Sequence, residues 1–537
     1  MAQAQPQLAS PAFSKKQAFM SLAAILLVYL AYGYFMQTLN VAAPRIAADL
    51  NGMALYSWSV SIPSLGLAIG TILAGKLSDI YGRRAIMLGS TFVFILGAVL
   101  SALSPTFTTL IAARSLLCLG QGAVAPLCFA VVGDMFIGGA RSKWIGMLNV
   151  PYGISALIGP TLSGWMVDAL SWRHIFWWSL PLLLLCLVFE SGMPPLVQGA
   201  AHKIDVAGAV LITIASSTLI FGLSFAGTTF PWGSVQVIGL LAVSAMFWAF
   251  FLRAESKASE PFFDMDLIKN RAFLTASIAG FLSFFGMMAL MLYYPLFMQS
   301  IQGISAMESG QIITPLSFVM AFVGLPVGLL VARTKSYKWM LVSGYALVSL
   351  VMFGMIFFDK NTPVYFGFVA AALSGLALGA MPTVNTIVTQ AAVPRRLLGV
   401  ATSALLFSVS MGMATAPALL GSAMNMRYNS TLKASLPGAI VQTASDATIK
   451  SLGDSRVLLS APAMSELRET LTKASSNGEA LFEQTVGAIR TSMESGLRIV
   501  FIIAAVAMLL AFLLILTIPV IPIDKPVEDN RAPSPIA

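Results

Sequence analysis

The sequence has little charge, and this scarcity limits the class of protein first. Only 10% of the 537 residues are Asp, Glu, Lys or Arg, whereas 58% are hydrophobic and the mean hydropathy is +0.85. Soluble domains carry about 25% charged residues, which gives them enough polar surface to face water. Because apolar runs recur from end to end, the sequence excludes a soluble enzyme and favours a protein that faces a lipid bilayer.

Cysteine and histidine are also scarce, which excludes most metal and disulfide sites. Cys118, Cys128 and Cys186 all lie inside apolar runs, so we interpret them as small core residues. His174 and His202 lie in predicted loops and form no ligand pair. The net charge is +9, but no long basic run offers a surface for nucleic acid. We therefore expect no metal, no cofactor and no nucleic-acid partner.

About fourteen apolar segments are long enough to cross the hydrocarbon core of a bilayer, which takes about 20 helical residues. The first follows Lys15 and Lys16, as a signal peptide would, but no clear cleavage site comes after it, so we expect a retained span. The sequence therefore predicts an all-α integral membrane protein. The predicted spans cover 19–39, 54–75, 85–103, 107–132, 144–167, 174–194, 205–225, 233–252, 272–298, 309–332, 339–358, 364–389, 399–423 and 497–521.

Lys and Arg are divided unequally between the two sides of the predicted bundle. An even number of spans places both termini on one side, and the loops on that side hold most of the basic residues. The short loops on the other side hold only Arg45, Arg173 and Lys360. The positive-inside rule therefore predicts that both termini are cytoplasmic. The long loop 424–496 lies on the outer side, where we expect residues 463–494 to form two short amphipathic helices that cap the outer face.

A pattern of glycines and charges lies between the second and third spans, at Gly75, Asp79, Gly82, Arg83 and Arg84. The glycines permit a tight turn, Asp79 can lie at the N-terminus of a neighbouring helix, and the arginines can pair across the mouth of the bundle. We interpret the pattern as a charge latch that holds one face shut. The alternative is ordinary anchoring by basic residues on the cytoplasmic side.

The fourth and fifth spans each carry a further motif. In the fourth span, Arg114 precedes a Gly-Gln121-Gly sequence and lies about 10 Å from the outer end at the α-helical rise. A buried arginine in a membrane is costly and indicates a functional site, although pairing with a backbone carbonyl or Gln121 is the structural alternative. In the fifth span, small residues form a stripe along which a facing helix can approach, and a proline adds a kink. These residues are Ser155, Gly159, Pro160, Ser163 and Gly164.

Together these motifs resemble those of the major facilitator superfamily, and in particular its fourteen-span drug:proton antiporter branch. The sequences 40–44 and 203–208 are similar to that branch, and Gly375 to Asn385 echoes the fourth span. The resemblance implies a monomer with two six-helix halves, 19–194 and 272–521, separated by two extra helices in 205–252. Cytoplasmic tails cover 1–18 and 522–537, and the loop 424–496 belongs to the second half. It also implies transport by alternating access in a plasma membrane, with a bacterial inner membrane expected.

The first span departs from that branch. Many relatives carry an acidic residue at the position of Phe35, and Gln37 replaces a usual threonine. Few carboxyls remain inside the spans, and Asp134 and Glu190, near the cytoplasmic ends, are the candidate proton carriers. The aromatic residues of the first span could instead bind a neutral or anionic aromatic solute together with Arg114, unless they face lipid. The expected cavity residues are Arg114, Gln121, Tyr29, Tyr32, Phe35, Gln37 and Asn385, with Tyr34 beside them.

The resemblance implies efflux of drugs or other amphipathic compounds coupled to protons. Uptake or export of a small aromatic metabolite, for example a vitamin such as riboflavin, is the alternative that the first span favours. A membrane receptor or scaffold that uses the 424–496 loop is an alternative of another class. Residues 70–77 almost match a phosphate-binding loop, but Leu77 fills the position of the magnesium-binding hydroxyl and the segment is a span. We therefore expect gradient-driven transport and no enzymatic activity.

Overall fold

The computed structural model describes residues 14–50, 58–136, 138–194, 206–227, 230–256, 265–304, 306–394, 397–436, 465, 468–469 and 478–522. Nearly all of these residues are helical. The first helices are α1 (Lys15–Asp49), α2 (Trp58–Tyr81), α3 (Arg83–Leu103), α4 (Phe107–Met135), α5 (Gly138–Ala169), α6 (Arg173–Ser191), α7 (Val206–Phe225) and α8 (Val235–Glu255). The others are α9 (Met265–Lys269), α10 (Arg271–Met288), the π-helix η2 (Ala289–Tyr293), α11 (Tyr294–Ser300), α12 (Ala306–Thr334), α13 (Lys338–Met355), α14 (Val364–Ala391), α15 (Leu398–Ser435) and α19 (Gly478–Leu516).

Thirteen helical segments in the described residues are long and apolar enough to cross a membrane. One of them joins α10, η2 and α11 into a single crossing, Arg271–Ser300. α2 is a further helix of 24 residues, which packs against α4 and ends at the Gly82 turn into α3. The expectation of an all-α membrane protein with about fourteen spans is therefore confirmed.

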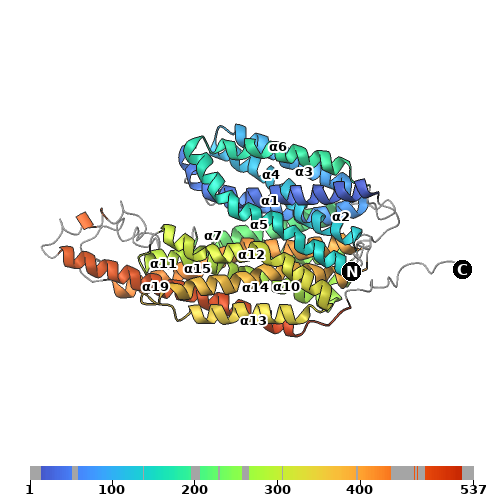
Figure 1. Ribbon diagram of the computed structural model, residues 1–537. Coiled ribbons are helices and arrows are strands. Elements are labelled where there is room, and N and C mark those ends of the chain that lie inside the picture. The colour runs from blue at the N-terminus through green and yellow to red at the C-terminus, as the bar shows by residue number, and fades with distance from the viewer. Residues whose placement is uncertain are drawn as a thin grey trace.

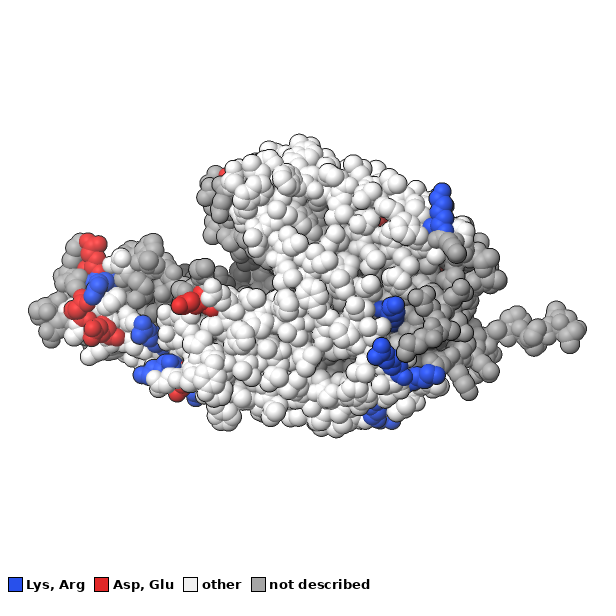
Figure 2. Space-filling view, in the orientation of Figure 1, with Lys and Arg blue, Asp and Glu red and all other residues white. Residues whose placement is uncertain are grey.

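The helices form two lobes, which Figure 1 shows one above the other. The N-terminal lobe consists of α1–α6 and the C-terminal lobe of α10–α19. We call the end of the bundle with the α2–α3 turn at Gly82 and the α12–α13 turn at Lys335 the basic end, and the opposite end, where α19 begins at Gly478, the loop end. Figure 2 shows Lys and Arg at both ends of the bundle, whereas most of the visible Asp and Glu lie at the loop end, on the left.

α7 and α8 pack where the two lobes meet. α7 contacts α2 of the N-terminal lobe and α15 of the C-terminal lobe. The turn between α7 and α8 needs glycine at Gly227, where φ is +71°. Trp232, just after this turn, donates its indole N–H to the Ser422 hydroxyl of α15. The extra helix pair is thus tied to both lobes rather than standing apart in the bilayer.

α15 and α19 are the longest helices and extend beyond the predicted spans into 424–496. They pack side by side near Tyr428 and Gly496, and Figure 1 shows their ends projecting at the loop end. The prediction of two short amphipathic helices over 463–494 is wrong from 478 onward, where α19 is continuous. The apolar residues of that segment that made it look amphipathic include Ile489 and Met493, which are buried. Most of 437–477 lies outside the described residues.

The lobes touch near the basic end and separate toward the loop end. Along α5, Gly139 lies against Ala332, Gly146 against Gly324, and Gly153 against Ala321. Beyond this point α5 turns its small residues to α1 of its own lobe, since the nearest neighbour of Gly159 is Gln37. Figure 2 shows the surface hollowed between the lobes at the loop end. A cleft therefore runs from the loop end to about the middle of the bundle.

Candidate functional site

A buried arginine organises the basic end of the N-terminal lobe. Arg83, the first residue of α3, is fully buried. Its Nε lies 2.7 Å from Oδ2 of Asp134 on α4, and its Nη1 pairs with Asp79 on α2 and donates to the Ser78 hydroxyl. A buried guanidinium needs such partners because an unpaired buried charge is very costly. Gly82 makes the turn that delivers Arg83 there, with φ at +87°.

The contact between the lobes at this end is made by Asp79 and Arg83 together. The Asp79 carboxylate and Nη1 of Arg83 both lie against Gly399, the second residue of α15, where a side chain would collide with them. The partial positive charge of a helix N-terminus stabilises a carboxylate at this place. The expectation that the arginines pair across the mouth is wrong for Arg83, because both of its acidic partners belong to its own lobe. Arg84 lies half-buried beside this cluster.

Two close approaches complete the closed basic end. A Cβ on Gly75 would lie 2.7 Å from Cβ of Ser403 and 2.9 Å from the carbonyl oxygen of Gly399. On the neighbouring helix, Gln390 of α14 donates to the carbonyl oxygen of Phe129 on α4 at 3.0 Å. The lobes are thus closed here by backbone contact and one buried amide. We refer to Asp79, Arg83, Asp134, Gly75 and Gly399 as the latch.

The small residues of the fifth span hold α5 against α1. Ser155 donates to the carbonyl oxygen of Leu30, and Ser163 to that of Thr38, both at 2.8 Å. Gly159 lies between them, against Gln37. Gly164 has no atom within 4 Å of the place of its missing Cβ, so it makes no close approach. The side chain of Pro160 lies outside the described residues.

A cluster of tyrosines lies at the floor of the cleft. Tyr29 and Tyr32 of α1 stack with ring centroids 5.3 Å apart, and Tyr152 of α5 lies 6.2 and 6.3 Å from them. Tyr152 precedes Gly153, the last inter-lobe contact named above along α5. Asn149, one turn earlier, donates to the Thr383 hydroxyl of α14 at 2.9 Å. Tyr32 and Tyr152 are half-buried, so part of each side chain is accessible.

Two of the predicted cavity residues join this tyrosine cluster. Gln37 reaches toward the Tyr152 hydroxyl at 3.5 Å, and Gln121 donates to the carbonyl oxygen of Tyr32 at 2.9 Å. Arg114 lies closer to the loop end, half-buried, and donates to the carbonyl oxygen of Ser59 at the start of α2. Its role in binding stays a prediction.

Three other residues that the sequence suggested for the cavity point elsewhere. Phe35 is buried inside the N-terminal lobe against Phe94 and Phe176, so its placement in the cavity is wrong. Tyr34 likewise turns away and donates to the carbonyl oxygen of Ile175 on α6. Asn385 is buried inside the C-terminal lobe, where it donates to the Tyr345 hydroxyl.

Sequence reasoning missed the residues that meet across the bundle. The sequence contains one indication of these residues, because each is a polar side chain inside an apolar span. They are Tyr152, Asn149 and Gln390. Their partners lie more than 100 residues away along the chain. Spacing along one helix therefore gave no indication of which of them would meet.

The two candidate proton carriers have different surroundings. Asp134 is one of the two acidic partners of Arg83, so its charge is matched. Glu190, in the last turn of α6, is fully buried, and its Oε1 accepts a hydrogen bond of 2.8 Å from the Thr91 hydroxyl on α3. Only the first of the two therefore belongs to the latch.

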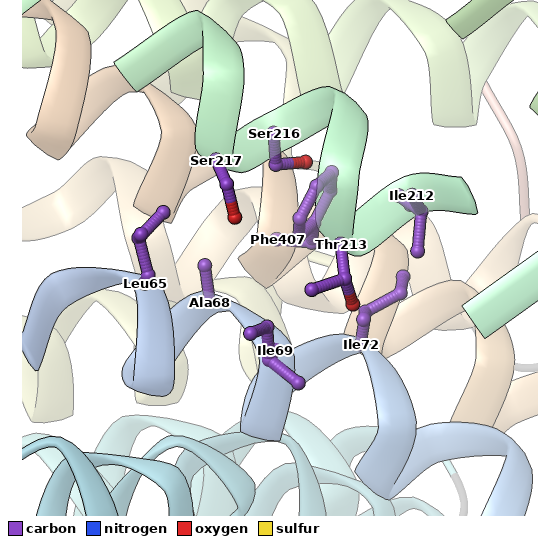
Figure 3. A pocket seen from close by; sticks show the side chains of 9 residues that line it. All are labelled: Leu65, Ala68, Ile69, Ile72, Ile212, Thr213, Ser216, Ser217 and Phe407. Atoms are coloured by element: carbon purple, nitrogen blue, oxygen red, sulfur yellow. The ribbon is translucent and has the colours of Figure 1, made fainter. Parts of the chain in front are cut away.

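A small cavity lies at mid-height where α2, α7 and α15 meet (Figure 3). Its walls are mostly apolar, with Leu65, Ile72 and Phe407 among them, and α7 adds the hydroxyls of Thr213, Ser216 and Ser217. Its volume of about 10 Å³ is at the lower limit of the space that one water molecule needs. The cavity is therefore too small for an organic solute and is separate from the cleft.

Comparison with known proteins agrees with this architecture. The pattern of the Major Facilitator Superfamily matches residues 25–417. The chain is 32% identical over 394 residues to the "Multidrug transporter protein MdtP" of Bacillus subtilis, covering 73% of each chain. The chain belongs to the major facilitator superfamily. It is thus a secondary transporter and not an enzyme, and the receptor or scaffold alternative is set aside.

Other members of the superfamily extend the match. The chain is 28% identical to "Multidrug resistance protein 3" of Bacillus subtilis, over 88% of this chain and 90% of that one. A solved proton:xylose symporter of the same superfamily superposes with a TM-score of 0.60 at 13% identity, covering 95% of this chain and 98% of that one. The human organic anion transporter MFSD10 superposes with a TM-score of 0.57 at 15% identity, covering 93% of this chain and 99% of that one. At these identities the two structures support the fold alone.

Proposed function

We propose that this protein exports amphipathic organic compounds in exchange for protons, with the tyrosine cluster as the floor of its binding site. The observation that carries the proposal is the position of Tyr29, Tyr32 and Tyr152, midway through the bundle and at the bottom of the cleft between the lobes. Aromatic rings bind flat apolar solutes by stacking and bind cations by their faces. The names of two bacterial relatives, both multidrug proteins, support the same substrate class.

The distribution of charge supports a sidedness for this transport. We assign the basic end to the cytoplasm of a bacterial inner membrane, with both termini on that side, because the short loops on that side hold most of the Lys and Arg. The structure then corresponds to a state whose cleft is open to the outside and whose latch is closed. Alternating access would release the latch, close the loop end and expose the tyrosine cluster to the cytoplasm. We take the working unit to be a monomer.

A dedicated transporter of a neutral or anionic aromatic metabolite is the second candidate. The groups named at the cleft floor are rings, hydroxyls and amides, with Arg114 nearer the opening. Neither Asp134 nor Glu190 lies among them, since each is bound to other residues inside the N-terminal lobe. Without a carboxylate at the floor, a cation would be held only by ring faces, which contribute roughly 0.5–2 kcal/mol each.

Binding to the purified protein separates the two candidates. A ligand that binds only the folded state raises the melting temperature, by an amount that grows with its concentration. We expect stabilisation by lipophilic cations and dyes if the first candidate is right, and by flavin-like or other aromatic metabolites if the second is right. If neither group of ligands raises the melting temperature and neither is transported in proteoliposomes, the tyrosine cluster is not the binding site.

Variants then test the site itself. Tyr32→Ala and Tyr152→Ala should each lower transport at least tenfold, because each removes a stacking surface, whereas the Phe variants should keep most of it. Tyr365→Ala is the matched control, since this tyrosine is 59% exposed on α14 and far from the cleft floor. Equal losses in Tyr365→Ala and Tyr152→Ala would show that the effect is general and that the site is misplaced.

A further inference from the structure

One buried carboxyl in the N-terminal lobe has no part in the latch or in the tyrosine cluster. Glu190 is 0% exposed, although it is only one residue from the end of α6. Its Oε1 accepts one hydrogen bond, from Thr91, and its Oε2 is buried with no hydrogen-bond donor among the described residues. An ionised carboxylate normally gathers several donors when it is buried.

The described charges near Glu190 do not compensate it. On α3 the nearest cations are Arg84 and Arg83, seven and eight residues or about 11 and 12 Å along the helix from Thr91. Arg84 is half-buried beside the latch, and both acidic partners of Arg83 are already in place. On α4, Asp134 is one of those partners, and on α1, Lys16 is exposed at the bundle end. The other titratable groups that face Glu190 are two thiols, Cys128 of α4 and Cys186 one turn earlier on α6.

A buried carboxyl in this setting costs least when it carries its proton. It would lose the proton only when water or a donor reaches it, which makes the site sensitive to the conformation of the lobe. Intramembrane carboxyls of this kind are expected to bind protons or ions rather than to stabilise the fold. Asp134 differs, because the adjacent guanidinium of Arg83 matches its charge.

One turn of α4 connects Glu190 to both of the places where transport is controlled. Cys128, on this turn, is close enough to Glu190 for the two groups to interact electrostatically, and it donates to the carbonyl oxygen of Ile25 on α1. The ring of the next residue, Phe129, stands edge-on to Tyr29 of the tyrosine cluster, with centroids 5.8 Å apart. The carbonyl oxygen of Phe129 accepts the hydrogen bond of Gln390 from the C-terminal lobe.

We propose that Glu190, held by Thr91, is the proton-binding carboxyl that couples proton movement to the opening of the two lobes. This inference rests on the proton-coupled transport proposed above. When Glu190 is protonated, the α3–α4–α6 packing is the one described here, with the amide of Gln390 bound across the lobes. When the proton leaves, the carboxylate must gather donors, and a shift of the 128–129 turn would loosen that inter-lobe bond and move Tyr29.

Infrared spectroscopy of the purified full-length protein tests proton binding without transport. The C=O stretching band of a protonated carboxyl should be present at neutral pH and disappear at higher pH. Glu190→Gln should remove this component, whereas the matched variant Asp134→Asn should leave it in place. Identical titrations of the wild type and Glu190→Gln would overturn the proposal. Thr91→Val, which removes only the hydrogen bond, should move the transition by about one pH unit and remains informative if Glu190→Gln folds poorly.

Proteoliposomes loaded with a lipophilic dye test the coupling. In Glu190→Gln, transport driven by an imposed pH gradient should fall at least tenfold, while exchange of dye across the membrane without a gradient persists. If wild-type transport ignores the pH gradient, the proton-coupled function proposed above fails and Glu190 loses its role with it. If wild-type transport follows the gradient and Glu190→Gln follows it equally, only the assignment to Glu190 fails.

Discussion

The two ends of the bundle hold their helices together in different ways. At the basic end a buried guanidinium is paired with two carboxylates inside the N-terminal lobe, and Asp79, Arg83 and glycines that allow backbones to touch meet the C-terminal lobe. At the loop end the lobes are apart, and the packing there lies within the C-terminal lobe, where α15 and α19 run side by side. An ion pair at this end, between Arg468 and Glu479 of α19, is exposed.

This difference indicates which end of the bundle can act as a conformational switch. A buried charge is tolerated when its partner is in place and is strongly destabilising when the partner is removed. A pair on the surface contributes little because water and salt screen it. The basic end can therefore be switched by moving one helix away from Asp79, whereas no comparable switch exists in the exposed charges of α15 and α19.

The largest expected effect is at the centre of the latch. Arg83→Ala would leave Asp79 and Asp134 without the buried guanidinium that pairs with both, which we expect to cost about 3–5 kcal/mol of the free energy of unfolding. The melting temperature of the purified protein should fall accordingly, and transport should be lost. Arg83→Ala combined with Asp134→Asn should recover part of the stability, because it removes the uncompensated charge. A single variant as stable as the wild type would contradict the description of the latch as buried and paired.

A smaller effect is expected where the lobes touch without charge. In Gly75→Ala the new methyl group would press on Ser403 and on the carbonyl oxygen of Gly399, so the closed basic end should be destabilised by about 1–3 kcal/mol. The lobes relieve this by separating, which should shift the population toward the state open at the basic end. Gly89→Ala is the matched control, because Gly89 has nothing within 4 Å of the missing Cβ.

Distances between spin labels measure that shift. Labels at Tyr81 of α2 and Thr334 of α12, both exposed at the basic end, report on lobe separation. We expect a longer distance to gain population in Gly75→Ala and the wild-type distribution in Gly89→Ala. Unchanged distances in both variants would mean that Gly75 is not a point of closure.

The sequence was sufficient to predict the helices and much of the latch, for physical reasons. Long apolar runs have one stable form in a bilayer, so the spans followed from composition. Part of the latch could be recognised because Gly75, Asp79 and Arg83 belong to a pattern of glycines and charges within ten residues, from Gly75 to Arg84. The direction of pairing could not be predicted, because the second acidic partner of Arg83, Asp134, is 51 residues away on another helix.

The tyrosine cluster marks the limit of sequence reasoning. Tyr32 and Phe35 are three residues apart on α1, yet Tyr32 lines the cleft and Phe35 packs inside the lobe. α1 has apolar residues on all sides, so its sequence has no polar face to indicate which side is wet. Tyr152 was overlooked because its partners come from α1, more than 100 residues earlier. Such a site depends on how helices pack, which spacing within one helix does not determine.

A modest effect is expected from the hydrogen bond between the lobes at mid-height. Asn149→Ala removes the donor to Thr383 and should destabilise the closed contact by about 1 kcal/mol. The same pair of spin labels should then show a smaller shift than Gly75→Ala does. Asn429→Ala is the control, because this asparagine donates to the carbonyl oxygen of Asn425 within α15 and bridges no lobes. A shift of equal size in Asn429→Ala would contradict a specific inter-lobe role for Asn149.

The smallest effect is expected from an exposed ion pair at the loop end, which is the opposite end of the bundle from the latch. Arg468 and Glu479 form an ion pair whose side chains are 58% and 51% exposed. Removal of either partner leaves a charge that water can solvate, so Arg468→Ala should leave the melting temperature and transport unchanged within error. High salt should likewise have no effect on the difference between this variant and the wild type. A clear loss of transport in Arg468→Ala would show that this end of the chain is energetically coupled to the cycle, and the contrast between the two ends would then be wrong.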